Sequence, residues 1–220
     1  MSADLFATGS GARAAVELLD GQIPVLAVDG IFDDPRRVRE AALALDYGPG
    51  TAHYPGRTAR FPPGDAALEG FLRKVVSLVE REYLPRLPAL PDGRSLSRVR
   101  GIDTDFAITD RHPDELDAEQ RKPHIDFVPV FGLIYLNEEE RGGTLFYKAL
   151  SSKPPATAEK GYPAASYPGL ELAGRIEGRF NRLAIYPGFI LHSGEIEGNW
   201  IASDARFQAP RLTQRMMFSF

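Results

Sequence analysis

Apolar residues in the first part of the chain recur with both a strand and a helix pattern. Residues 23–28 form a continuous apolar run that predicts a buried strand. Asp33 or Asp34 then predicts a helix start, with Pro35 in the first turn, where proline is favoured. The apolar residues that follow recur at i, i+3, i+4 and i+7 and predict one buried stripe: Val38, Ala41, Ala42 and Leu45.

A second helix is expected from about Asp65 to Pro85. Its predicted buried face consists of four apolar residues at helical spacing: Leu68, Leu72, Val75 and Val79. We expect both helices to buttress a sheet. Residues 1–96 are therefore predicted to form a mainly helical support region.

Residues 97–220 instead alternate strands with turns. The run 124–136 is apolar and rich in Val, Ile and aromatic residues, as a buried strand should be. Pro129 and Gly132 interrupt it, which predicts two strands with a bend between them. Two further strands are expected, at 182–186 and 211–220. The pattern indicates one domain, mainly β with a helical N-terminal part, in a barrel or sandwich.

Two long segments of the second part have little periodicity, 149–170 and 194–208. Loops of this length in a compact domain often act as lids or binding loops. We expect them to determine which substrate is bound.

Composition excludes several classes of site. The chain has no cysteine, so disulfides, thiolate metal sites and a cysteine nucleophile are excluded. The net charge of -4 provides no electrostatic footprint for nucleic acid. Residues 1–21 lack the pattern of a signal peptide, and no apolar run is long enough for a membrane span. We therefore expect a cytoplasmic protein that binds neither nucleic acid nor membrane.

Two histidines and an aspartate carry the candidate chemistry. One residue, Ile125, separates His124 from Asp126, and in an extended strand residues i and i+2 point to the same face. His192 from a neighbouring strand would complete a two-histidine, one-carboxylate face that leaves other metal positions open, as in non-haem Fe(II) sites. Taken alone, the motif also fits a surface histidine beside an acid.

Such a site with two neutral imidazoles and one carboxylate leaves Fe(II) with a net charge of +1, which favours an anionic 2-oxo acid. The second carboxylate of 2-oxoglutarate would need a cation, and arginine pairs two oxygens at once. Arg211 begins the last strand, and Thr213, two residues on, faces the same way. Arg215 on that face and Arg206 before it are alternatives.

Together, these motifs resemble the prolyl-hydroxylase-like branch of the Fe(II)/2-oxoglutarate-dependent dioxygenases, and small bacterial members in particular. The resemblance covers about residues 122–148 and 180–220. The matching pieces are His124-Ile-Asp126, Tyr135-Leu-Asn137, Gly142-Gly-Thr-Leu-Phe146, Asn181-Arg-Leu183, His192 and Arg211-Leu-Thr213. The segment between His192 and Arg211 is longer than is usual in this branch, which keeps Arg206 open.

The resemblance implies a double-stranded β-helix (jelly roll) with His124, Asp126 and His192 as Fe(II) ligands. It also implies that Tyr135 and Arg211 bind the distal carboxylate of 2-oxoglutarate, with Thr213 assisting. The expected reaction is hydroxylation of an unactivated C–H bond with release of succinate and CO2. The substrate is left open between an amino-acid side chain, free or peptidyl, and a small metabolite.

Two other functions remain open. One is a cupin-like metalloenzyme without 2-oxoglutarate, although cupins typically supply more histidines than the four present here. The other is a non-catalytic jelly roll that binds a ligand. Asp103 and Asp105 form a second carboxylate pair, which we interpret as structural salt bridges because no histidine lies near them in the sequence. No motif indicates the oligomeric state.

Overall fold

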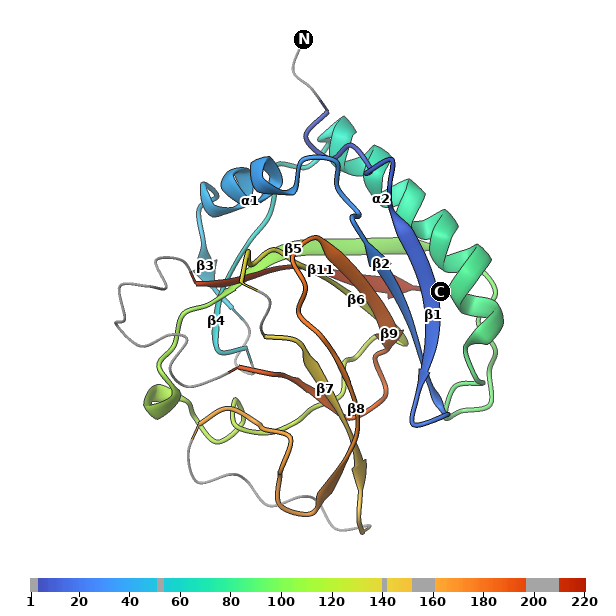
Figure 1. The fold of residues 1–220 in the computed structure, drawn as a ribbon, viewed down its shortest axis with the longest axis vertical. Helices are drawn as coiled ribbons and strands as arrows, with labels where there is room; N and C mark the ends of the chain where they lie inside the picture. The colour runs from blue at the N-terminus through green and yellow to red at the C-terminus, as the bar shows by residue number, and fades with distance from the viewer. Residues whose placement is uncertain (1–3, 51–53, 140–141, 152–160, 197–209) are drawn as a thin grey trace.

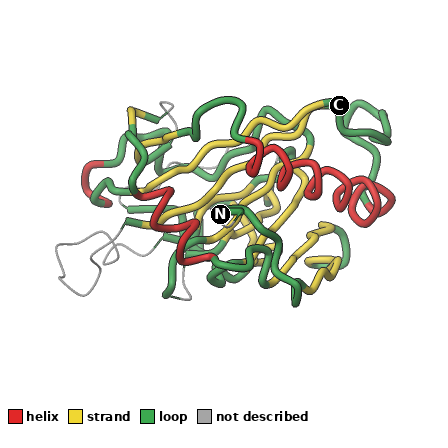
Figure 2. The backbone as a smooth tube through the Cα atoms, turned by 90° about the horizontal axis from the view of Figure 1, so that it is seen from above, coloured by secondary structure: helices red, strands yellow, loops and turns green. Residues whose placement is uncertain are grey.

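The computed structural model describes residues 4–50, 54–139, 142–151, 161–196 and 210–220. Within them, two antiparallel sheets face each other, and helices cover the outer face of the larger sheet (Figures 1 and 2).

The larger sheet has the strand order β1-β2-β9-β6-β11-β5-β4-β3. Its strands are β1 (Arg13–Leu19), β2 (Ile23–Asp29), β3 (Gly48–Pro49), β4 (Gly56–Ala59), β5 (Gly101–Thr109), β6 (Val130–Tyr135), β9 (Arg182–Pro187) and β11 (Arg211–Ser219). The smaller sheet has the order β10-β7-β8. Its strands are β7 (Thr144–Ala149), β8 (Leu170–Ile176) and β10 (His192–Gly194).

The helices begin at the residues that the sequence predicts. Helix α1 (Pro35–Leu43) is capped by the Asp34 side chain, and helix α2 (Ala66–Leu78) by that of Asp65, each accepting a hydrogen bond from a backbone N–H of the first turn. A π-helical turn, η1 (Val79–Tyr83), and a 3-10 turn, η2 (Leu84–Arg86), follow α2. A further short 3-10 turn is η3 (Pro113–Glu115).

The buried face of α2 differs from the predicted one at a single position. Phe71 is 1% exposed, whereas Leu72 is only partly buried. Positions 71 and 72 are both compatible with a helical stripe through Leu68 and Val75, and the phenyl ring occupies the space between helix and sheet. Helical periodicity therefore allows either residue 71 or residue 72 to be buried, and the larger side chain, Phe71, is the one that packs against the sheet.

The inner and outer faces of the larger sheet have separate cores. On β11, Leu212, Met216 and Phe218 pack towards the helices, whereas Met217 packs towards the smaller sheet. The alternation follows from the two-residue period of a strand, so Arg211, Thr213 and Arg215 also face inward, where they line a common pocket. The two facing antiparallel sheets confirm the predicted double-stranded β-helix with buttressing helices.

Residues 1–96 contribute more than helical support. Strands β1 to β4 all belong to the larger sheet, so the expected division at residue 96 does not coincide with a structural boundary. Strand β1 could not be predicted from its sequence, because this edge strand is largely exposed on both faces and has no apolar alternation. The other strand of that hairpin, β2, is buried and was predicted.

The segment 124–136 is only half strand. β6 begins at Val130, because Pro129 before it has no N–H to donate to a ladder. His124 forms an isolated bridge with His192, and Asp126 lies outside any strand. Gly132, expected to interrupt the run, lies inside β6, where a Cβ would approach Ile185 Cδ1 to 2.7 Å.

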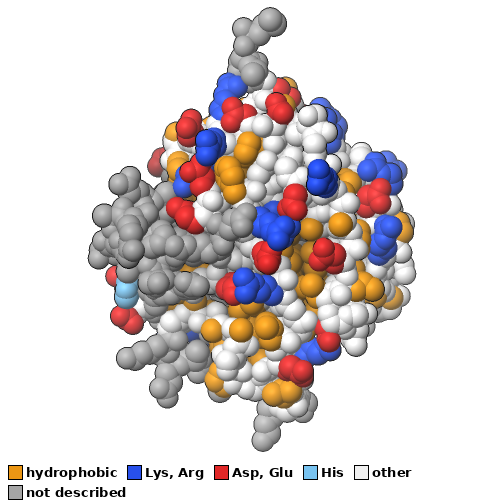
Figure 3. All heavy atoms as spheres, viewed as in Figure 1, with side chains coloured by type: hydrophobic (Ala, Val, Ile, Leu, Met, Phe, Trp, Pro, Cys, Tyr) orange, Lys and Arg blue, Asp and Glu red, His pale blue; other side chains and the backbone are white. Residues whose placement is uncertain are grey.

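No helix of the described residues combines the length and apolarity that crossing a bilayer requires. On the face seen in Figure 3, acidic and basic side chains are interspersed. A cytoplasmic location and the absence of a nucleic-acid partner remain predictions.

Candidate metal centre

The structure brings His124, Asp126 and His192 together. One potential ligand atom from each lies within 4.8 Å of the others, and the two imidazole centroids are 4.7 Å apart. His192 opens β10 in the smaller sheet and is 3% exposed, whereas His124 is exposed. The group therefore has one buried and one accessible side.

Main-chain hydrogen bonds hold the two ligand segments side by side. The N–H of His124 donates to the His192 carbonyl and the N–H of His192 to the His124 carbonyl, both at 2.8 Å. The N–H of Asp126 donates to the Gly188 carbonyl at 2.8 Å. These bonds fix the segment beside His192, and the side chains of His124 and Asp126 converge on one point although neither residue lies in a named strand.

Gly188 leaves the room that this approach requires. A Cβ at residue 188 would lie 2.2 Å from the Val128 carbonyl oxygen and 3.1 Å from Asp126 Cβ. A side chain there would push the aspartate segment away.

Hydrogen bonding determines which nitrogen of His192 faces Asp126. Nδ1 lies 2.8 Å from the Ile190 carbonyl oxygen, which can only accept, so Nδ1 carries the proton. In the neutral ring, Nε2 then presents a lone pair 3.2 Å from Asp126 Oδ2. That oxygen is buried and makes no hydrogen bond within the described residues, although the separation is within ion-pair distance. A cation shared by these two atoms would satisfy both, so the donor set fits a divalent transition metal.

A pocket of about 450 Å³ adjoins this group on the inner face of the larger sheet. Its apolar wall includes Phe131, Leu133 and Tyr186. Its polar lining includes the three candidate ligands together with Thr144, Arg211, Thr213 and Arg215. The pocket thus combines an apolar enclosure with a few convergent polar groups, as small-molecule sites do.

Arg211 lies in this pocket and is 4% exposed. Its Nε and Nη2 donate to the Gly142 carbonyl at 3.2 and 3.1 Å. A carbonyl carries no net charge, and no carboxylate of the described residues pairs with this guanidinium. Thr213 Oγ1, two residues along the same face, is buried and has no hydrogen-bond partner there either. Both groups could therefore serve a carboxylate that enters the pocket.

Tyr135 lies opposite Thr213 in the strand register. Its hydroxyl is 2.7 Å from Thr144 Oγ1 in the buried interior. Burial raises the pKa of the Tyr135 phenol, despite the hydrogen bond with Thr144, so the phenol stays neutral at pH 7. Tyr135 is not among the residues that line the pocket, whereas its partner Thr144 is.

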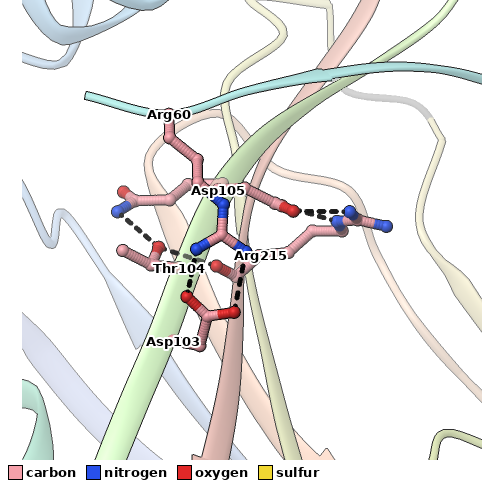
Figure 4. A network of polar contacts seen from close by, with 6 residues as sticks. Arg60, Asp103, Thr104, Asp105 and Arg215 are labelled. Atoms are coloured by element: carbon pink, nitrogen blue, oxygen red, sulfur yellow. Dashed lines mark hydrogen bonds and ion pairs between the residues drawn. The ribbon is translucent and has the colours of Figure 1, made fainter. Parts of the chain in front are cut away.

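Arg215 points into the same pocket but has an acidic partner. Its Nε and Nη2 each donate to one Asp105 oxygen at 2.7 Å, and Arg60 forms an ion pair with Asp103 (Figure 4). The two aspartates thus form salt bridges, as interpreted from the sequence. The rival Arg206 lies outside the described residues, as do His53 and Trp200.

Sequence reasoning assigned no role to Thr144 or Tyr186. Tyr186 lies 5.1 Å from His192 between ring centroids, and Thr144 is the hydroxyl partner of Tyr135. Burial raises the pKa of Tyr186 well above its ordinary value, and the Asp126 charge adds to this. Alternation along β7 and β9 could have identified both as inward-facing residues.

Several solved structures are similar to this chain. A prolyl-4-hydroxylase from Pseudomonas putida has 15% sequence identity, with 84% of this chain and 81% of that chain covered and a TM-score of 0.39. The alpha-ketoglutarate-dependent epimerase SnoN from nogalamycin biosynthesis has 17% identity, with coverages of 88% and 77% and a TM-score of 0.46. HygX from Streptomyces hygroscopicus, with nickel, 2-oxoglutarate and hygromycin B bound, has 14% identity, coverages of 89% and 82% and a TM-score of 0.43.

No curated protein sequence matches the chain. A family model matches residues 11–159 and 151–218, which is nearly the whole length. The chain therefore belongs to the family of unknown function DUF6445.

Proposed function

We propose that this protein is an Fe(II)- and 2-oxoglutarate-dependent oxygenase of the prolyl-hydroxylase-like branch, formed by residues 1–220 as one domain. Its expected reaction is hydroxylation of an unactivated C–H bond with release of succinate and CO2. The observation that carries the proposal is the buried, unpartnered Asp126 oxygen facing the lone pair of His192, with His124 beside them.

In this proposal, His124, Asp126 and His192 hold the metal. Two neutral imidazoles and one carboxylate leave a divalent ion with a net positive charge, which favours an anionic cosubstrate. When bound, Fe(II) would supply the oxygen-activating redox chemistry that side chains lack. The Ile190 carbonyl keeps the proton of His192 on Nδ1 and so keeps Nε2 available.

Arg211 is the proposed partner of the distal carboxylate of 2-oxoglutarate. It is buried, and among the described residues its guanidinium donates only to the uncharged Gly142 carbonyl. Thr213 Oγ1 would donate to the same carboxylate, and Tyr135 would contact it through its hydroxyl. Arg215 is less suited to this role because Asp105 already occupies two of its donors.

Calorimetric titration under anaerobic conditions tests the proposal. We expect wild-type protein to bind one Fe(II) and then 2-oxoglutarate. His192→Ala should lose the metal and, with it, the cosubstrate. Arg211→Met should keep the metal but bind 2-oxoglutarate about 10- to 100-fold more weakly, because charge-assisted hydrogen bonds to the carboxylate are lost. Arg36→Met, which removes an exposed arginine, is the matched control.

Other results would identify the competing functions. Metal binding without affinity for 2-oxoglutarate would favour a cupin-like metalloenzyme. Failure to take up any metal would favour a non-catalytic jelly roll. Either result would reject the proposal.

A further inference from the structure

Arg215 occupies a position in the pocket that the proposed iron and cosubstrate sites do not use. It lies on β11, four residues after Arg211 and on the same inward face. Its side chain is 17% exposed, and that of its partner Asp105 is 7% exposed. The guanidinium is therefore largely enclosed, yet it remains part of the pocket wall.

Two neighbours fix this guanidinium. Asp105 accepts hydrogen bonds from Nε and Nη2, both at 2.7 Å (Figure 4). The ring of Tyr54 lies over the cation, with 4.8 Å between Arg215 Cζ and the ring centroid. The Tyr54 hydroxyl is 3.0 Å from Thr109 Oγ1, which holds the ring in turn. Arg215 is thus held from one edge and from one face.

The other edge of the guanidinium remains available. Arginine carries five N–H donors, and Asp105 uses only two of them. No acceptor for the remaining three is found among the described residues. A buried ion pair is rarely worth more to stability than apolar side chains of the same size. Donors held ready at a pocket wall therefore point to recognition of a ligand.

Arg215 and Arg211 serve different parts of the pocket. Along a strand, residues i and i+4 are about 13 Å apart at the backbone. Their side chains also have different partners, since Arg211 donates to Gly142 before β7 and Arg215 to Asp105 on β5. Lys122, which also lines the pocket, lies in a more exposed ion pair with Glu119 at 2.7 Å. With Arg211 assigned to the cosubstrate, Arg215 is the enclosed cation of the pocket wall left for a second anion.

Apolar side chains flank the Asp126 segment at the edge of the pocket. Ile125 is 50% exposed and Phe127 is 99% exposed, and both belong to the pocket lining. Exposed apolar side chains gathered at the edge of a pocket are typical of ligand-binding grooves. An apolar group of a bound molecule beside Asp126 would bury part of both.

We propose that Arg215 binds a carboxylate of the substrate, and that the substrate is a small carboxylate with an apolar group beside the acid. This inference rests on the proposed function, since it assigns Arg211 to the cosubstrate. Arg215 is a specificity-determining residue in this scheme, and Asp105 and Tyr54 position it.

The test compares two probes of the same shape, 3-phenylpropanoate and its neutral amide. Wild-type protein is loaded with Mn(II) and N-oxalylglycine, an unreactive mimic of 2-oxoglutarate. Binding near the metal is measured from the paramagnetic relaxation of the probe protons. We expect the carboxylate to bind about ten-fold more tightly than the amide, because Arg215 offers charge-assisted hydrogen bonds to it alone.

Variants separate recognition from a structural role. Arg215→Met alone would leave Asp105 buried and unpaired, so the test uses the double variant Arg215→Met/Asp105→Leu, which removes both charges. It should lose the preference for the carboxylate. Asp105→Asn keeps the cation and should keep the preference. Equal binding of the two probes by wild type, or a preference that survives in the double variant, would overturn the proposal.

A further measurement shows whether the carboxylate that Arg215 binds belongs to the substrate or to the cosubstrate. The double variant should bind N-oxalylglycine as wild type does. Weaker binding would mean that Arg215 holds the cosubstrate, which rejects the substrate assignment. If wild type does not bind N-oxalylglycine, the proposed function fails. The probe comparison can still be made with Mn(II) alone, so the two failures are distinguishable.

Discussion

Single side chains replace missing main-chain partners at two places beside strands of the larger sheet. Asn137 Oδ1 accepts from the Leu212 N–H at 2.8 Å, just after Arg211. Asn181 accepts from the Phe32 N–H and donates to the Phe32 carbonyl, both at 2.9 Å. Both asparagines belong to motifs that carry the family resemblance, and both connect segments distant in sequence. Both asparagines therefore contribute to the fold, and neither lines the pocket.

Replacing Asn181 should destabilise the fold. Asn181→Ala removes two buried hydrogen bonds and leaves a Cβ at a φ of 65°, so we expect a loss of about 2–4 kcal/mol. Asn181→Gly should lose about 1 kcal/mol less, since glycine adopts this conformation freely. Urea unfolding measures both. Equal losses for alanine and glycine would contradict the conformational part of this explanation.

Gly188 offers a test of how closely the ligand segments must approach. Gly188→Ala places a methyl group against the Val128 carbonyl and Asp126, so we expect Mn(II) affinity to fall about 10- to 100-fold. Gly11→Ala is the matched control, because nothing lies within 4 Å of a Cβ there. Calorimetry of the folded variants measures the affinity. Unchanged metal binding in Gly188→Ala would show that the segment adjusts without cost.

At the scale of elements, the sequence predicted what depends on local chemistry. The helix starts at Asp34 and Asp65 followed from capping, and the iron-ligand candidates followed from residue type and strand periodicity. The hydrogen-bond partners of Arg211 and Arg215 could not be predicted from local sequence chemistry. They depend on the register between strands far apart in sequence, such as Thr213 opposite Tyr135 and Arg215 opposite Asp105. Exposed β1 was also missed, because an edge strand needs no apolar face.

An ion pair joins β2 to β9, and its strength should depend on pH. Arg182 donates to both Asp29 oxygens at 2.6 and 2.8 Å. The hydrogen bond and charge of Arg182 lower the pKa of Asp29, against the opposing effect of partial burial. A lowered carboxyl pKa stabilises the fold fully above the unfolded pKa of about 3.9, and this contribution is lost as the pH falls through the folded pKa.

Asp29→Asn should therefore lower the free energy of unfolding at pH 7 by less than about 1 kcal/mol, since Asp29 is nearly half exposed and solvent screens the pair. The difference from wild type should shrink as the pH falls below 4. Urea unfolding at pH 7, 5 and 3 measures it. A difference that stays constant across this range would exclude the ion pair as its cause.

At the scale of the whole molecule, the candidate metal group connects the two sheets. His192 belongs to the smaller sheet, while His124 and Asp126 lead into β6 of the larger one. One apolar core lies between the sheets, and an ion pair from Lys148 of β7 to Asp20 beside β1 also joins them. A bound metal would therefore restrain the sheets relative to each other.

Metal addition should raise thermal stability. At a metal concentration 100 times Kd, we expect about 2.7 kcal/mol of stabilisation, or a Tm increase of about 5–10 °C for a domain of this size. His192→Ala should show no increase. His112→Ala, which removes the N-cap histidine of η3 outside the group, should keep it. An equal increase in His192→Ala would indicate that the metal binds elsewhere.

The reciprocal backbone bonds between His124 and His192 have a consequence for engineering. Because peptide groups make them, exchanging either imidazole for another donor leaves the framework in place. New coordination chemistries could thus be installed at this position by side-chain replacement alone, without redesigning the surrounding barrel.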